Sequence, residues 1–370
     1  MTAATARPVV FTGDILRFQT HGGITRYFAE IVPRLPRLVS VSGGLHCSAE
    51  AAGFGPRLQV AARIPSSPAA RRLAAPLNVA IDRAALWNAR NAIIHPTYYR
   101  DPRSLPRGRP VVVTVHDMAH ERHPEMLPHR RRWWSAGDPA RHKAALCARA
   151  DRVLCNSHAT RADVIHFLGT PESKLRVVHH AGRDWERIVA RPIAGVGGRF
   201  LLWVGPRHGY KNFWGTAAAW SVCGPAADTA FVLIGGGPLG RGERERLAGL
   251  GVLERIVQRD ASDGELRWAY EHATGLLYTG LWEGFGLPVL EALALGCPVV
   301  ASDVPALREV GGEAVRYADP RDQDSMSEAI ARCLEEDRSP AAAEARQARA
   351  AVFSWDACAE GVEAVYRELD

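Results

Sequence analysis

Short runs of apolar, mostly β-branched residues alternate with amphipathic stretches along nearly the whole chain. In the first half, strands are expected at residues 9–12, 58–62, 92–95, 111–115, 152–155 and 175–179. Helical spacing of apolar positions is clearest at residues 24–35, 69–88, 129–150 and 159–168. Strands that alternate with helices predict parallel sheets with helices on both faces, which makes this an α/β protein.

The same alternation restarts in the second half. Strands are expected at residues 200–204, 231–234, 256–257, 276–278 and 298–301, and a charged, alanine-rich helical tail at 340–370. Residues 187–199 have the glycine and proline content of a linker. Because 370 residues exceed the usual ceiling for one core, we expect two domains, at residues 1–185 and 186–353, with a cleft between them.

The segment Glu283-Gly-Phe-Gly-Leu-Pro-Val-Leu-Glu291 follows one of these strands and carries the most specific chemistry of the chain. Its glycines allow the backbone to approach a ligand, and Pro288 suits a first helical turn. The amides of Phe285, Gly286 and Leu287 should then point out of a helix N-terminus, where the partial positive charge favours a phosphate. Glu283 and Glu291 could hold sugar and ribose hydroxyls on either side of it.

At these residues the chain resembles the family 4 glycosyltransferases, retaining enzymes of the GT-B fold that take a sugar from a nucleotide diphosphate. The likeness continues through residues 292–302 and 305–312, and it departs from the family at Tyr278-Thr279-Gly280. The resemblance implies two Rossmann-like domains with parallel sheets facing a cleft. It further implies that Glu283 contacts the donor sugar, that Glu291 contacts the ribose, and that residues 354–370 form a last helix crossing back to the first domain.

A second candidate segment, Gly205-Pro-Arg-His-Gly-Tyr-Lys-Asn212, follows the first strand of the second half. Its two cations, Arg207 and Lys211, could neutralise a diphosphate and stabilise charge on the departing oxygen. The family carries an Arg and a Lys in a matching glycine-led loop. The competing interpretation is two ordinary surface cations. With Gly205 and Gly284, these residues complete the donor-binding set predicted for the second half.

In the first half, Val115-His116-Asp117 ends an expected strand. The resemblance implies that His116 lies near the donor sugar and the reacting centre. Asp117 either orients this histidine, which would put it on the acceptor side, or simply caps the next segment.

Near the N-terminus, His21-Gly-Gly-Ile-Thr-Arg-Tyr27 stands between a strand and a helix. Gly22 and Gly23 could admit a phosphate or sugar close to the backbone, or could form a plain tight turn. Arg26 and Tyr27 are candidates for acceptor contacts.

Two other motifs suggest different chemistry. Gly235-Gly-Gly-Pro-Leu-Gly240 satisfies the dinucleotide fingerprint, with Asp260 20 residues beyond it, so an NAD-dependent oxidoreductase is the main alternative. It follows the second strand of its domain, however, and contains Pro238. Asp322-Gln-Asp324 imitates a metal site but precedes a helix whose capping explains both acids, so no metal or other cofactor is expected. A non-catalytic sugar-nucleotide-binding partner is a third possibility.

Charge and composition constrain partners and location. Residues 1–184 carry 27 Lys and Arg against 13 Asp and Glu, a net +14, and the remainder carries a net −8. Within the basic half, Arg130-Arg-Arg-Trp-Trp134 could contact an anionic membrane surface or a lipid pyrophosphate, or could be a solvated face with tryptophans in the core. No nucleic-acid-binding motif is recognisable. Scattered cysteines and the lack of a signal-like or spanning stretch predict a cytoplasmic protein, with any membrane association peripheral.

The substrates follow only from the resemblance. The Gly-Gly-Ile-Thr-Arg-Tyr and Val-His-Asp segments look like those of bacterial surface-polysaccharide mannosyl- and rhamnosyltransferases. This implies GDP-mannose or a GDP-deoxyhexose as the donor, with UDP and TDP sugars open. The acceptor is expected to be a glycan, either lipid-linked or soluble.

Overall fold

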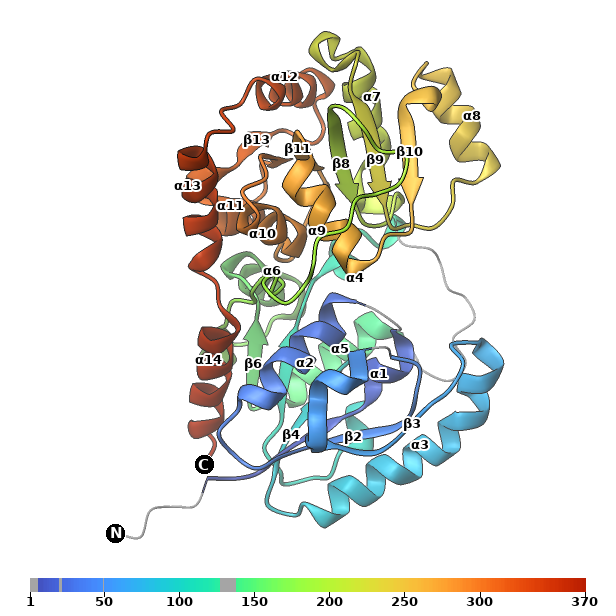
Figure 1. Ribbon diagram of the computed structural model, residues 1–370. Helices are drawn as coiled ribbons and strands as arrows, with labels where there is room; N and C mark the ends of the chain where they lie inside the picture. Colours follow the sequence, from blue (N-terminus) through green and yellow to red (C-terminus); the bar gives the residue numbers. More distant parts are fainter. Residues whose placement is uncertain (1–5, 20–21, 49, 127–137) are drawn as a thin grey trace. The chain divides into compact units, whose positions relative to one another are not determined.

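The computed structural model describes residues 6–19, 22–48, 50–126 and 138–370, apart from the side chains of residues 50, 60 and 61. The chain divides into two compact units. Unit 1 comprises the described residues within 1–124 and 128–180 together with 354–370, and unit 2 comprises 181–353 with the described residues of 125–127. Figure 1 shows strands and helices alternating within each unit.

Unit 1 contains a parallel sheet in the order β3-β2-β1-β4, continued by β5-β6-β7. A parallel bridge between Ile94 and Val111 joins the two parts. The strands are β1 (Val9–Thr12), β2 (Val39–His46), β3 (Leu58–Arg63), β4 (Ile93–Pro96), β5 (Val112–Val115), β6 (Arg152–Cys155) and β7 (Leu175–Val177). The helices are α1 (Asp14–Phe18), α2 (Gly23–Arg34), α3 (Pro68–Asn88), α4 (Ala119–Arg122), α5 (Pro139–Arg149), α6 (His158–Leu168) and α14 (Trp355–Arg367).

Unit 2 repeats this arrangement in the order β10-β9-β8-β11-β12-β13, and all its strands are parallel. Its strands are β8 (Phe200–Val204), β9 (Ala230–Ile234), β10 (Ile256–Arg259), β11 (Gly275–Tyr278), β12 (Val299–Ser302) and β13 (Arg316–Ala318). Its helices are α7 (Phe213–Val222), α8 (Arg241–Gly249), α9 (Asp263–His272), α10 (Leu287–Ala294), α11 (Pro305–Gly311), α12 (Gln323–Leu334) and α13 (Pro340–Ala351). In both units the strand order is that of the Rossmann fold, so the predicted α/β class is confirmed.

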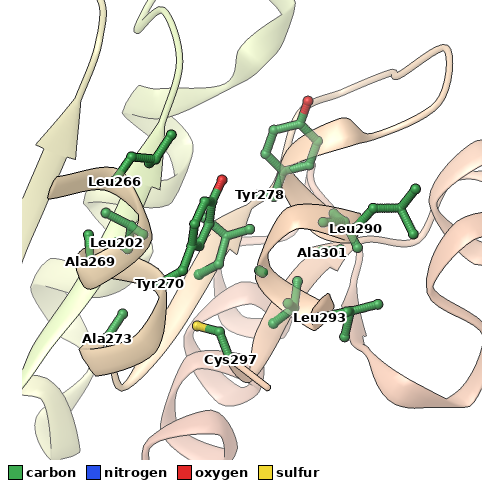
Figure 2. Packing of buried hydrophobic residues seen from close by; sticks show 14 of the residues in the cluster. Leu202, Leu266, Ala269, Tyr270, Ala273, Tyr278, Leu290, Leu293, Cys297 and Ala301 are labelled. Carbon is green, nitrogen blue, oxygen red and sulfur yellow. The ribbon is translucent and has the colours of Figure 1, made fainter. Parts of the chain in front are cut away.

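The core of unit 2 lies where α9 and α10 cover one face of the sheet. Figure 2 shows Leu266 and Tyr270 of α9 and Leu290 and Leu293 of α10 beside Tyr278 of β11. All five are buried, and each fully buried leucine contributes about 1.5–3 kcal/mol. This packing fixes α10, whose first turn belongs to the candidate site.

Two observed strands were not predicted, and the predicted helical tail is interrupted. Strand β2 and strand β13 were not predicted: the pair Gly43-Gly44 interrupts the apolar pattern of β2, and β13 has only three residues. Of the helix expected at residues 129–150, residues 129–137 lie outside the described chain; α5 begins at Pro139, where Asp138 accepts a hydrogen bond from the amide of Ala140 at 3.0 Å. The helical tail is two helices, α13 and α14, separated by residues 352–354.

Helix α14 belongs to unit 1 although its sequence follows unit 2. Arg37 donates two hydrogen bonds to Glu363, each 2.7 Å long, and a further one to Asp370 at 3.0 Å. Tyr366 lies at 2.6 Å from Nδ1 of His95 on β4. These buried polar contacts attach α14 to the sheet of unit 1.

In the part of the chain that the structure describes, helices long enough to cross a bilayer are insufficiently apolar to do so.

Candidate functional site

In unit 2 the strand order reverses between β8 and β11, and ligands of such sheets bind beyond the carboxyl ends of the strands at this point. Two loops meet there, residues 205–212 and residues 279–286. The amide of Leu281 donates to the carbonyl oxygen of Tyr210 at 2.7 Å, and Nδ2 of Asn212 donates to the carbonyl oxygen of Thr279 at 3.1 Å. The two segments that the sequence singled out separately are therefore hydrogen-bonded to each other.

Lys211 and Glu283 form the ion pair at the centre of these loops. Nζ of Lys211 lies 2.8 and 3.0 Å from the two carboxylate oxygens of Glu283, and it donates to the hydroxyl of Tyr278 at 3.3 Å. Burial alone would lower the pKa of Lys211, but the charge of Glu283 raises that pKa well above its ordinary value. Lys211 is therefore a fixed cation whose side chain is still 18% exposed.

The first turn of α10 follows the second loop. Gly286 precedes the helix with a φ of 105°, and a Cβ on it would lie 2.5 Å from Cδ2 of Leu307, so only glycine fits there. Pro288 occupies the first turn, as predicted from the sequence. The N-terminus of α10 and the ammonium of Lys211 thus contribute positive charge at the same end of the sheet.

Glu291 lies one turn into α10 and is 5% exposed. The hydroxyl of Tyr270 donates to its Oε2 at 3.3 Å, and Nε of Arg183 lies 3.6 Å from its Oε1. The burial of Tyr270 and the neighbouring Glu291 raise the pKa of this tyrosine, which stays a hydrogen-bond donor. Figure 2 shows the hydroxyls of Tyr270 and Tyr278 directed to the same side. Neither Arg183 nor Tyr270 was predicted, because neither belongs to a recognisable motif.

Arg207 is only 4% exposed, and its guanidinium is used within the protein. It donates to the carbonyl oxygens of Gly235 and Gly237, both at 2.9 Å, and to Glu243 of α8 at 2.9 Å. The hydrogen bond from Arg207 lowers the pKa of Glu243. A Cβ at Gly236 would lie 2.7 Å from Nη1 of Arg207. The glycine-rich turn that resembles a dinucleotide fingerprint is therefore built around an arginine side chain.

The acidic pair after β13 is a helix cap in this structure. Asp322 accepts hydrogen bonds from the amides of Asp324 and Ser325, at 2.9 and 3.2 Å. This is the capping arrangement that the sequence suggested for α12.

In unit 1, His116 directly follows β5 and is buried. Burial, followed by the nearby His95 and Lys143, lowers the pKa of His116 to about 3, so its imidazole is neutral. Nδ2 of Asn156 donates to its carbonyl oxygen at 2.8 Å. Within the described residues, Nε2 of His116 has no hydrogen-bond partner.

The other residues of unit 1 that were predicted to contact substrates differ in their burial and contacts. Oδ1 of Asp117 accepts from the amide of Ala119 at 3.1 Å, which is the capping arrangement. Gly22 and Gly23 form the start of α2, where Gly22 is the N-cap in an extended conformation. Arg26 lies in the first turn of this helix. Tyr27 is 1% exposed and its ring stacks on His180 with centroids 4.4 Å apart, so it packs in the core. Arg130 to Trp134 lie outside the described residues.

Two family models match the sequence along most of its length. The model described as Glycosyltransferase Family 4 matches residues 21–181, and the model described as Glycosyl transferases group 1 matches residues 198–336. The chain belongs to the family 4 glycosyltransferases. The family membership predicted from the segment Glu283 to Glu291 is thus confirmed.

Similar curated proteins include mannosyltransferases and D-inositol 3-phosphate glycosyltransferases. The O-antigen chain mannosyltransferase B of Escherichia coli is 30% identical over 60% of this chain and 55% of its own length. The O-antigen chain mannosyltransferase RfbU of Salmonella typhimurium is 39% identical over 49% and 50%, respectively. The MMP alpha-(1->4)-mannosyltransferase of Mycolicibacterium hassiacum is 27% identical over 70% and 66%. This family 4 chain therefore spans about half to two thirds of the length of these relatives.

Solved structures resemble the family 4 chain over nearly its whole length. HepE of Anabaena in complex with UDP and glucose superposes with a TM-score of 0.70 at 19% identity, covering 98% of this chain and 100% of that one. The sucrose-phosphate synthase of Thermosynechococcus elongatus gives a TM-score of 0.68 at 18% identity, covering 98% and 99%. At these identities the likeness concerns the fold, and it confirms the GT-B class predicted from the sequence.

Proposed function

We propose that this chain transfers a hexose from a nucleoside-diphosphate sugar to a glycan acceptor in polysaccharide synthesis. The observation that carries the proposal is the Lys211–Glu283 ion pair, which lies at the switch point of β8 and β11 beside the first turn of α10. A cation, a helix N-terminus and a carboxylate at one place fit a diphosphate that carries a polyol.

Within unit 2 the roles divide by charge. Lys211 and the amides of Phe285 to Leu287 would bind the diphosphate, and Gly205 and Gly284 would let the backbone approach it. Glu283 would accept hydrogen bonds from the hexose. Glu291, oriented by Tyr270 at 3.3 Å, would accept them from the ribose. Arg207 would support the diphosphate site from behind, since its own hydrogen bonds go to the Gly235–Gly237 turn and Glu243.

The chemical step breaks the bond between the anomeric carbon and the phosphate oxygen, which leaves negative charge on that oxygen. A lysine whose pKa is raised stays protonated throughout and stabilises this charge. We propose retention of configuration through same-face attack assisted by the leaving phosphate, without an enzyme nucleophile or a metal. The neutral imidazole of His116 would offer a hydrogen bond to the hexose, and Gly22 and Gly23 would lie close to the donor.

Three of the similar curated proteins are named as mannosyltransferases, which favours mannose. Two of them are O-antigen chain mannosyltransferases, so GDP-mannose or a GDP-deoxyhexose is the proposed donor and a growing, lipid-linked glycan the proposed acceptor. The HepE structure contains UDP, which makes UDP the first alternative to test. The NAD-dependent alternative is disfavoured because Arg207 donates into the turn that a pyrophosphate would have to approach.

A thermal-shift panel of GDP, UDP, TDP and NAD tests the donor class. A ligand at 100 times its Kd adds about 2.7 kcal/mol to the free energy of unfolding, so the matching nucleotide should raise Tm clearly. We expect GDP to give the largest shift and NAD none. A shift with NAD alone would support the oxidoreductase instead.

Release of nucleoside diphosphate in the presence of acceptor then tests the reaction. GDP should appear from GDP-mannose in proportion to the glycan extended. Binding of GDP without release, in the presence of every acceptor that the relatives use, would indicate a non-catalytic binding partner.

A further inference from the structure

Helix α3 of unit 1 exposes apolar side chains in an ordered row. Leu73, Leu77 and Trp87 are 82%, 51% and 69% exposed, and Ala80 and Ala84 are exposed between them. These five residues, the α3 stripe, are spaced four, three, four and three residues apart, so they share one side of the helix. Of the ten large apolar side chains that are most exposed in the described chain, four lie on α3, which exceeds random scatter.

The reason is that α3 is attached to unit 1 through a side that buries Asn78 and Asp82 together with Ala74 and Leu86. Asn78 pairs with the backbone of Leu45 through hydrogen bonds of 2.8 and 3.0 Å. Asp82 accepts from Arg17 at 2.8 Å and from Arg100 at 3.0 Å. A helix of a globular protein normally buries its apolar stripe and exposes its polar side. Here the longest apolar row is exposed, and Figure 1 shows α3 at the periphery of unit 1, alongside β2.

The exposed part of α3 is also cationic. Arg72 and Arg83 are exposed and lie 11 residues, about three turns, apart, so they form a line beside the stripe, and Arg90 is exposed just beyond the end of the helix at Asn88. The guanidinium of Arg90 lies 5.0 Å from the ring centroid of Trp87. Asp82 is the one acidic residue of α3, and it is 1% exposed. The surface therefore offers apolar groups and positive charge without exposed acid.

We propose that the α3 stripe and the three arginines form a docking surface for an anionic lipid bilayer. The stripe would lie among the acyl chains at the interface, Trp87 would sit at the headgroup level, and the arginines would contact anionic headgroups. This orientation places the axis of α3 parallel to the membrane plane. The surface is independent of the donor site proposed in unit 2.

A second copy of the chain fits this surface less well. Leucines at alternating spacings of four and three could pair two α3 helices, but in an antiparallel pair the two-fold axis would bring the arginine lines of both copies together. Since α3 has no exposed acid to balance them, the like charges would oppose the contact. An anionic bilayer satisfies the apolar and the cationic groups together.

Co-sedimentation of the full chain with vesicles tests the proposal. We expect binding to phosphatidylcholine vesicles that contain about one third phosphatidylglycerol, and weaker binding to phosphatidylcholine alone. Raising the salt from about 0.1 M to about 1 M should weaken the binding, because the Debye length falls from about 10 Å to about 3 Å.

Two pairs of variants locate the surface. Leu73→Gln/Leu77→Gln should lower the partition coefficient by roughly tenfold or more. Its matched control, Val189→Gln/Val222→Gln, removes two apolar side chains of unit 2 that are 77% and 60% exposed and should change nothing.

The second pair concerns charge. Arg72→Gln/Arg83→Gln should lower the partition coefficient roughly tenfold and reduce its dependence on salt. The control is Arg241→Gln/Arg332→Gln, whose side chains are 93% and 62% exposed in unit 2. Equal losses in a test pair and its control would overturn the proposal, as would absence of binding by the native chain. Unchanged Tm and circular dichroism verify that each variant is folded.

A dye on the helix reports insertion directly. All seven cysteines are buried, so Ala80→Cys can be labelled selectively with an environment-sensitive fluorophore. Anionic vesicles should shift its emission to the blue, whereas the same dye on Val222→Cys should not respond. Concentration-dependent dimers that disappear in Leu73→Gln/Leu77→Gln, without any vesicle response, would assign the surface to a second copy instead.

Discussion

The two sheets share one strand order, yet the charged groups at their switch points are arranged differently. In unit 1, where β1 meets β4, Asp82 is 1% exposed and is held by both Arg17 and Arg100. In unit 2, where β8 meets β11, Lys211 is paired with Glu283 alone and keeps 18% of its side chain exposed. The carboxylate of Asp82 is fully used by its two arginines. The ammonium of Lys211, in contrast, can bind a phosphate oxygen in place of Glu283.

The shared strand order therefore provides the same position in both sheets, but it does not determine whether the charged groups there stabilise the fold or bind a ligand. In unit 1 the charges join α1, α3 and the segment after β4, so they contribute to stability. In unit 2 the cation stands beside the first turn of α10, whose dipole reinforces it. Substitutions in the cluster of unit 1 should therefore lower stability, whereas substitutions at the ion pair of unit 2 should lower activity.

The largest effect is expected for the free energy of unfolding when the cluster of Asp82, Arg17 and Arg100 is changed. Asp82→Asn leaves two half-buried arginines without their shared carboxylate, and the free energy of unfolding should fall by about 3 kcal/mol. Urea denaturation measures this. The control Asp356→Asn, with a side chain that is 82% exposed, should change it by less than about 0.5 kcal/mol. If Asp82→Asn stays as stable as this control, the cluster in unit 1 is not structural.

The next largest effect is expected for the rate of transfer when the Lys211–Glu283 ion pair is changed. Lys211→Ala should slow transfer by roughly 100-fold or more, which corresponds to loss of an oxyanion-stabilising donor. The rate of nucleoside diphosphate release at saturating substrates measures it, and Lys174→Ala serves as a control in unit 1. The double variant Lys211→Met/Glu283→Gln should regain stability relative to Lys211→Ala but no activity. A normal rate in either variant would remove Lys211 from the reaction.

Buried, neutral histidines in unit 1 should make its stability depend on pH. Burial lowers the pKa of His95 on β4 to about 3, whereas an unfolded histidine has a pKa of about 6.5. Between these values the unfolded chain binds more protons, so stability is complete above about pH 6.5 and falls as the pH decreases. Each such histidine contributes up to about 1.4 kcal/mol per pH unit in this window.

The variant His95→Gln should reduce that slope. Its free energy of unfolding, measured between pH 7 and pH 5, should fall less than that of the native chain, by up to about 2 kcal/mol. His272→Gln changes an exposed histidine and should leave the slope unaltered. Equal slopes in all three proteins would mean that His95 is not neutral and buried in solution.

A smaller effect is expected behind the donor site. Arg207→Lys keeps the charge but cannot reach Gly235, Gly237 and Glu243 at once. We expect the donor KM to rise roughly tenfold with kcat changed much less, since the residue would position the loop rather than contact the reacting atoms. Arg241→Lys, on the exposed side of α8, should leave both constants unchanged. A fall in kcat alone would place Arg207 at the phosphate itself.

Several parts of the fold could be predicted from the sequence because they depend on local patterns. Strands β1, β6 and β8 have the predicted bounds, since each is a short, almost entirely apolar run flanked by polar residues or glycine. Strand β2 could not be predicted, because its two serines and two glycines are tolerated only between β1 and β3. The break between α13 and α14 falls at Ser354, whose hydroxyl accepts from the amide of Ala357 at 3.1 Å, and it agrees with the last helix that the resemblance implied at residues 354–370.

The site shows the same division. Glu283, Gly286 and Pro288 belong to one motif, and the geometry at α10 follows from their spacing. The burial of Arg207 and of Tyr27 depends on groups distant in sequence, namely Glu243 and His180, and no local pattern predicts it. Arg183 and Tyr270 contribute to the surroundings of Glu291 for the same reason.

Titration calorimetry with the nucleoside diphosphate that gives the largest thermal shift can separate the two units directly. This ligand lacks the hexose, so its affinity reports the diphosphate site alone. We predict that Lys211→Ala raises its Kd at least about tenfold, because one charge-assisted contact is lost, while His116→Ala leaves the Kd within about twofold. Native affinity in Lys211→Ala, together with lost affinity in His116→Ala, would contradict a diphosphate site at the switch point of β8 and β11.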